Sequence, residues 1–82
     1  MIDIVGLAEI LGYSKIWVKT NKNDFAYEDG THISGTFVKA KQFWTFDEVQ
    51  EILLHLYRSG KFDYQRFFKC MERFVLIRDY GD

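Results

Sequence analysis

The sequence contains no proline and a single cysteine, Cys70. A lone cysteine excludes a disulfide bond within the chain and is typical of proteins from a reducing compartment. No apolar run approaches the ~18 residues that a membrane helix needs, and the N-terminus, acidic at Asp3, does not resemble a signal peptide. We therefore expect a cytoplasmic protein that has no membrane partner.

The chain also lacks an excess of charge of either sign. Its 82 residues include 11 Lys or Arg and 12 Asp or Glu, for a formal net charge of −1. Many small nucleic-acid-binding domains are strongly basic, so the total charge argues against that function. However, residues 14–23 carry three lysines and no acid, and residues 58–78 carry six basic residues against two acids. A nearly neutral total can therefore hide a basic face.

Near the N-terminus, a small residue, a glycine and an aliphatic residue have the spacing of two crossed helices. Ala8 lets the helices approach closely, Gly12 can take the positive φ that ends the first helix, and Val18 fills the space between them. Ser14 is a favourable N-cap for the second helix, which we expect over about residues 15–22. Three lysines at positions i, i+4 and i+7 would share one side of that helix: Lys15, Lys19 and Lys22.

The middle of the chain has the composition of short strands joined by turns. Residues 25–45 are rich in aromatic and β-branched side chains, with Asp-Gly and Ser-Gly pairs between them. We place the more certain strand within residues 36–44 and leave the register open. Lys39 and Lys41 would alternate along this strand and point the same way, either toward a ligand or as protection of an exposed strand edge.

Two amphipathic helices are expected to follow. The first, over residues 46–58, begins with a capping box in which Thr45 and Glu48 can bond to each other's backbone amides. The second covers about residues 63–77. Its apolar side is wide enough to serve both as core and as a dimer interface, for which we list Leu54, Tyr64, Phe67, Phe68 and Met71. Beside it lies a basic stripe that is either a solvated face or a phosphate contact: Arg66, Lys69 and Arg73.

Residues 7–54 resemble the winged helix-turn-helix domain of the MerR and phage excisionase group. The resemblance rests on LAEILGYSKIWV and on the later stretch FWTFDEV, which is similar to the passage from the wing into a capped acidic helix. The length indicates one domain over residues 1–82, and the patterns above give a mainly α fold with a small β-hairpin, in the order helix, helix, hairpin, helix, helix. The resemblance implies that this domain is a winged helix-turn-helix. The second helix would enter the major groove and the wing would contact the backbone or the minor groove. The resemblance places Ser14, Lys15, Lys19 and Thr20 at DNA, with Lys39 and Lys41 on the wing. To these we add Lys22, from the shared side of the second helix, and Trp17, which could stack on a base or sugar or belong to the core or an interface.

We therefore expect a small DNA-binding protein, such as a phage-type regulator or an excisionase-like protein, that binds double-stranded DNA as a homodimer or a cooperative array. No arginine precedes Arg58, so the second helix has no donor for the bidentate guanine contact. This absence, the neutral charge and the aromatic content of 18% favour an alternative, a winged-helix module that binds another protein.

Catalysis and metal binding find little support in the sequence. There is no phosphate-binding loop and no nucleophile motif. Glu51 and His55 lie one helical turn apart, but no third metal ligand is evident beyond Glu48. We expect no enzymatic activity, no cofactor and no metal.

Overall fold

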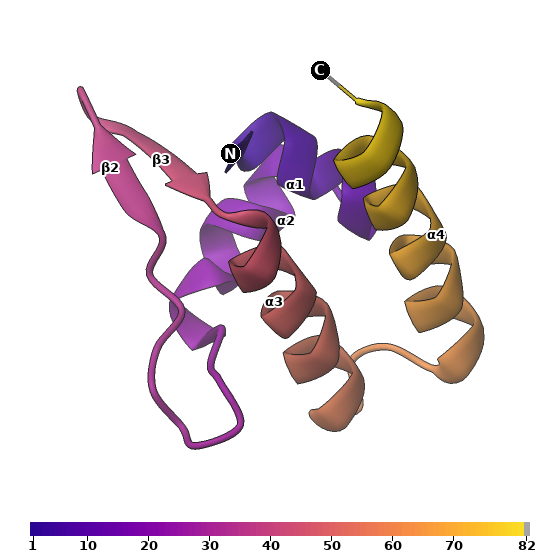
Figure 1. Cartoon of the computed structure of the whole chain (residues 1–82). Coiled ribbons are helices and arrows are strands. Elements are labelled where there is room, and N and C mark those ends of the chain that lie inside the picture. Colours follow the sequence, from indigo (N-terminus) through magenta and orange to yellow (C-terminus); the bar gives the residue numbers. More distant parts are fainter. Residues whose placement is uncertain (82) are drawn as a thin grey trace.

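The computed structural model describes residues 1–81, which form a mainly helical domain with a small antiparallel sheet (Figure 1). Within these residues there are four α-helices: α1 (Ile4–Leu11), α2 (Lys15–Asn21), α3 (Phe46–Arg58) and α4 (Tyr64–Tyr80). A short 3-10 helix, η1 (Lys22–Asp24), follows α2. The sheet consists of β1 (Ile2–Asp3), β2 (Thr36–Val38) and β3 (Lys41–Trp44). The mainly helical class with a small β-hairpin is thus confirmed.

The first two helices have the ends that their sequence predicts. The Asp3 carboxylate accepts a hydrogen bond from the Gly6 amide at 2.9 Å, and Gly12 ends α1 in the left-handed region with φ of 74°. The Ser14 hydroxyl accepts a hydrogen bond from the Trp17 amide at 3.1 Å and so caps α2. Val18 is fully buried between the helices. The local prediction for this pair of helices is confirmed.

The sheet differs from the expected hairpin in two respects. Both strands of the hairpin lie within residues 36–44, where we expected one strand, and β1 adds a third strand, giving the order β1-β3-β2. β1 pairs with β3 through Ile2 and Trp44. The hairpin turn is Lys39-Ala40, with φ of 50° and 67°. The expectation that Lys39 and Lys41 alternate along one strand is therefore wrong, because Lys39 lies in the turn and Lys41 begins β3.

The expected first strand, within residues 25–35, is a loop in the structure. Its only ladder contact is an isolated bridge between Ala26 and His32. Phe25 and Ile33 anchor the two ends of this loop in the core, each about 1% exposed. The loop therefore contributes core side chains without adding a strand to the sheet.

The core joins the sheet to the three longer helices. Trp44 at the end of β3 is fully buried, and the capping box at Thr45 and Glu48 then starts α3, with bonds of 3.1 and 2.9 Å. From α3 the core receives Val49, Ile52, Leu53 and Leu56. α4 packs on α3 and α1 through buried Cys70 and Phe74 and runs three residues beyond its predicted end. None of the described helices has the length and apolar character needed to cross a membrane.

Candidate functional site

Five lysines lie in two stretches of the chain that contain no acidic residue. Residues 10–23 hold Lys15, Lys19 and Lys22, and residues 30–46 hold Lys39 and Lys41. The fold connects these stretches directly, because the Lys22 ammonium donates a hydrogen bond to the Gln42 side-chain oxygen at 2.6 Å. The β2–β3 hairpin projects from the helical body on the side of η1 (Figure 1). Two basic segments about 20 residues apart in sequence thus form one surface.

A shallow groove of about 310 Å³ lies between the hairpin and the first helices. We call it the lysine groove. It brings together lysines from three elements, namely Lys19 of α2, Lys22 of η1 and Lys41 of β3. The remaining lining residues come from β1, α1 and the hairpin: Asp3, Ile4, Val5, Phe37, Ala40 and Gln42. Asp3 is the one acidic side chain in this lining, and its carboxylate is engaged as the N-cap of α1.

Lys22 differs from the other lysines of this surface. We expected it on the second helix, but α2 ends at Asn21 and Lys22 begins η1. Its side chain is half-buried, is bonded to Gln42, and its ammonium lies 5.8 Å from the centre of the Phe37 ring. Lys22 therefore holds the hairpin against η1, and fewer of its donors remain for a ligand.

The other residues expected at DNA differ in how exposed their side chains are. Lys15 and Lys19 on α2 and Lys39 in the hairpin turn are exposed. Ser14 and Thr20 are also exposed, although the Ser14 hydroxyl is occupied by the cap of α2. By contrast, the ring of Trp17 is half-buried and stacks on Tyr13, with 4.1 Å between ring centres. Stacking on Tyr13 leaves Trp17 less available to a ligand.

No salt bridge joins the lysines of this surface to a carboxylate in the described residues. Within residues 1–81 the only salt bridge joins Arg78 to Asp79, at the far end of α4. Uncompensated cations attract anionic ligands, and the attraction is strongest where several cations share one concave surface. The lysine groove therefore has the electrostatic character of a phosphate-contacting surface despite the net charge of −1.

Sequence reasoning missed the apolar part of this surface. Phe37 and Val5 line the lysine groove and are 62% and 52% exposed, and Ile16 on α2 is 75% exposed. Recognition of a complete hairpin within residues 36–44 would have placed Phe37 and Gln42 opposite each other, as the observed register does. The groove can thus take a ligand that is both anionic and partly apolar.

The residues expected at a dimer interface divide into two groups. Tyr64 and Phe68 are exposed on α4, at 65% and 53%, and their rings stack on each other. Phe67, Met71 and Leu54 are half-buried, and Phe67 stacks on Tyr57 of α3 with 4.8 Å between ring centres. Part of the aromatic side therefore joins α4 to α3. The dimer contact remains a prediction, reduced mainly to Tyr64 and Phe68.

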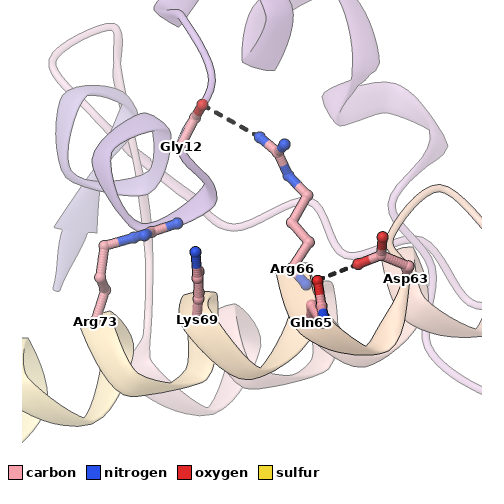
Figure 2. Close-up of a pocket in the computed structure, with 6 residues that line it drawn as sticks. All are labelled: Gly12, Asp63, Gln65, Arg66, Lys69 and Arg73. Carbon is pink, nitrogen blue, oxygen red and sulfur yellow. Dashed lines mark hydrogen bonds between the residues drawn. The ribbon is translucent and has the colours of Figure 1, made fainter.

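The basic stripe of α4 is not an ordinary solvated face. Arg66 and Arg73 are half-buried and reach toward the C-terminal end of α1, whereas Lys69 between them is exposed (Figure 2). Arg73 donates from Nε to the Ile10 carbonyl at 2.9 Å, and Arg66 donates from Nη2 to the carbonyls of Leu11 and Gly12 at 3.2 Å. Both arginines thus satisfy carbonyls that the end of a helix leaves unpaired.

The surroundings of Cys70 and His55 shift the pKa of each side chain. Burial raises the pKa of the Cys70 thiol, although Arg73 and Arg66 oppose the shift. Partial burial, followed by the nearby charges of Arg58 and Lys61, lowers the pKa of His55. Within the described residues, no three His, Cys, Asp or Glu side chains gather as ligands for a metal ion.

A small helical domain with a basic groove beside a hairpin is the class of protein that this structure defines. A family model described as a domain of unknown function, DUF7229, matches residues 5–76. Because the match spans most of the chain, the protein belongs to this family. No curated protein and no solved structure matches the chain.

Proposed function

We propose that the protein binds double-stranded DNA through α2 and the β2–β3 hairpin, as a winged helix-turn-helix. The observation that carries this proposal is the groove that lysines from α2, η1 and the hairpin line together, with Asp3 as the one acid in its lining. Lysines position a protein on the phosphate backbone, which supplies most of the affinity and little of the sequence preference.

In this proposal α1, the turn at Gly12 and α2 form the helix-turn-helix, and the β2–β3 hairpin is the wing. Lys15 and Lys19 are exposed on α2, as a helix that approaches a groove of DNA requires. The resemblance of residues 7–54 to the MerR and excisionase group supports the same arrangement. The bond between Lys22 and Gln42 would fix the hairpin relative to α2.

Salt dependence of binding tests the proposal. Four lysines are exposed on this surface, namely Lys15, Lys19, Lys39 and Lys41, since Lys22 is engaged with the hairpin. Four phosphate contacts predict a slope of log affinity against log salt of roughly −3 to −4 per protomer. The measurement is fluorescence anisotropy of a labelled random duplex at about 50 to 200 mM salt, the range in which such slopes are resolved. Absence of salt-sensitive binding to any duplex at low ionic strength would reject the proposal.

A second candidate is the binding of an acidic protein segment in the same groove. It is favoured by the exposed apolar side chains of Val5 and Phe37 among the lysines, because an acidic peptide with apolar anchors complements both. If the anisotropy experiment detects no DNA binding, binding of an acidic protein segment becomes the preferred function. It predicts that Phe37→Ser weakens partner binding more than Lys39→Ala does.

A further inference from the structure

A second cationic site lies on the opposite side of the α1–α2 turn from the hairpin, between that turn and α4. Its lining residues are Gly12, Asp63, Gln65, Arg66, Lys69 and Arg73, around a cleft of about 380 Å³. Figure 2 shows Arg66, Lys69 and Arg73 rising from one side of α4 toward Gly12. None of these three residues lines the lysine groove.

The two guanidinium groups converge on a single point. The Nη2 atoms of Arg73 and Arg66 lie 3.1 and 3.5 Å from the position that a Cβ at Gly12 would occupy. Two like charges held this close repel each other unless groups of opposite charge lie nearby. The carbonyls of α1 supply only part of that compensation, since the end of a helix carries about half a negative charge.

No carboxylate completes the compensation. Within the described residues, neither arginine forms a salt bridge, and Asp63, the one acid in the lining, is engaged as the N-cap of α4 by the Arg66 amide at 2.8 Å. The end of α1 and the N-terminus of α4 carry opposite partial charges, so three cations and one carboxylate leave a net charge of about +2 around the cleft. The cleft is therefore positively charged.

Lys69 has no structural role that accounts for its position. It lies between the two arginines on α4, is exposed, and makes no hydrogen bond or salt bridge in the described part of the chain. The arginines, by contrast, are fixed: the Arg66 guanidinium stacks 3.9 Å from the centre of the Tyr13 ring, and Arg73 is bonded to both Ile10 and Cys70. A guanidinium group that is already held in place keeps its unused N–H donors in a fixed direction, and its side chain loses little conformational entropy when a ligand binds.

We propose that this cleft binds an oxyanion of the phosphate class, held by Arg66, Lys69 and Arg73. Arginine presents a planar fork of donors that matches the oxygens of phosphate, and lysine adds a point charge. A phosphate group of either kind presents more oxygens to this set of donors than a carboxylate does. The anion is either a free phosphate or phosphate monoester, or a phosphate of a nucleic-acid backbone. The site does not rest on DNA binding by the lysine groove.

The test uses the full chain and inorganic phosphate as the probe. Amide shifts in a heteronuclear NMR spectrum are followed as phosphate replaces chloride at constant ionic strength. We expect saturable shifts at Gly12 and in the first turns of α4. Lys69→Ala should weaken this binding about tenfold, the usual effect of losing one charge-assisted hydrogen bond, and should leave the melting temperature unchanged. Arg58→Ala removes the same charge from the exposed end of α3 and should not change phosphate affinity.

A parallel titration separates the two sources of the anion. If a short duplex displaces inorganic phosphate, and Lys69→Ala lowers the affinity for that duplex, the site takes a backbone phosphate. If phosphate stays bound when duplex is added, the site takes a free phosphate or monoester. Both results support an oxyanion site, and both can be obtained even if Lys15→Ala and Lys19→Ala have no effect on DNA.

Two outcomes would overturn the proposal. One is the absence of saturable shifts up to tens of millimolar phosphate. The other is a response that Lys69→Ala and Arg58→Ala reduce equally, because that would show general attraction to positive charge. Lys69 is the residue to test, since replacement of either arginine would also disturb the end of α1.

Discussion

Arg73 on α4 donates a hydrogen bond from Nε to the Ile10 carbonyl at the end of α1, at 2.9 Å and across 63 residues of sequence. Together with Arg66, it makes α4 the cap of the first helix. The turn between α1 and α2 is therefore held from outside as well as by Gly12. Its geometry, and with it the position of α2, depends on the last helix of the described structure.

Replacement of Gly12 by Ala should destabilise the fold more than replacement of Gly60. Both glycines have positive φ, 74° and 82°, so each alanine introduces a backbone strain of about 1–2 kcal/mol. Only at Gly12 would the new Cβ crowd a guanidinium, 3.1 Å from Arg73 Nη2, whereas Gly60 has open space. We expect Gly12→Ala to lower the free energy of unfolding by about 1 kcal/mol more than Gly60→Ala. Urea denaturation of both variants measures this difference. Equal losses of unfolding free energy would show that Arg66 and Arg73 move away from the new Cβ without destabilising the fold.

Removal of lysines should affect DNA binding according to their exposure. We expect Lys15→Ala with Lys19→Ala to reduce the salt slope by about two units, and Lys39→Ala by about one, since each exposed lysine accounts for one phosphate. The melting temperature should stay nearly constant in these variants because their side chains are exposed.

Lys22→Ala should behave differently, because Lys22 bonds to Gln42 and lies over Phe37. It should lower the melting temperature and change the salt slope by less than one unit. Anisotropy titrations paired with thermal melts distinguish the two patterns. A full unit of slope lost with Lys22→Ala at unchanged melting temperature would show that its ammonium contacts phosphate.

Phe68→Glu should reduce self-association. Phe68 is 53% exposed beside Tyr64 and borders a shallow apolar groove with Met71 and Val75 on α4. If this surface forms the predicted dimer contact, sedimentation of the wild type at tens of micromolar will show species larger than a monomer, and the glutamate will remove them. Tyr80→Glu is the control, because Tyr80 is 82% exposed and lies outside that groove. A wild type that is monomeric at these concentrations would contradict the predicted dimer contact, and Tyr64 and Phe68 would then be ordinary exposed side chains.

Acid should destabilise the fold in part through His55. Burial lowers the pKa of His55 in the folded chain below the ordinary histidine value of 6.5, so the unfolded chain takes up a proton first as the pH falls. Stability should therefore decrease as the pH falls through 6.5 and level off below the lowered pKa. The measurement is the unfolding free energy of the wild type minus that of His55→Gln between pH 8 and pH 5, about 1.5 units to either side of an ordinary histidine pKa. A difference that does not vary with pH would show that His55 titrates alike in both states.

The sequence predicted the features that depend on near neighbours. The caps at Asp3, Ser14 and Thr45 each join residues three positions apart, so the local order of side chains was sufficient to place them. The turn at Lys39-Ala40 escaped prediction because neither residue is one of the glycines or asparagines that usually mark positive φ in a hairpin. The pairing of β1 with β3 depends on a register between residues 42 positions apart, which no local pattern specifies.

The candidate sites were predictable to a similar extent. The helical periodicity of residues 15–22 correctly predicted that Lys15 and Lys19 are exposed on one side of α2. It could not predict that Lys22 lies outside this helix, because the pattern does not show that α2 ends at Asn21. The capping of α1 by Arg66 and Arg73 could not be predicted, because the carbonyls that they bind lie 54 to 63 residues away in the sequence. A basic stripe on an amphipathic helix reads as a solvated face until its neighbours are known.

The dependence of α1 on α4 also bears on how the chain acquires its shape during synthesis. The ribosome releases α1 and α2 first, yet the carbonyls of Ile10 and Leu11 receive their partners only when residues 66–73 have emerged. Until then the pair of helices also lacks the cover of Cys70 and Phe74. In a nascent chain that ends before α4, the last carbonyls of α1 would thus have no arginine partners. The turn that positions α2 on the proposed DNA surface would be held from outside only after α4 has been translated.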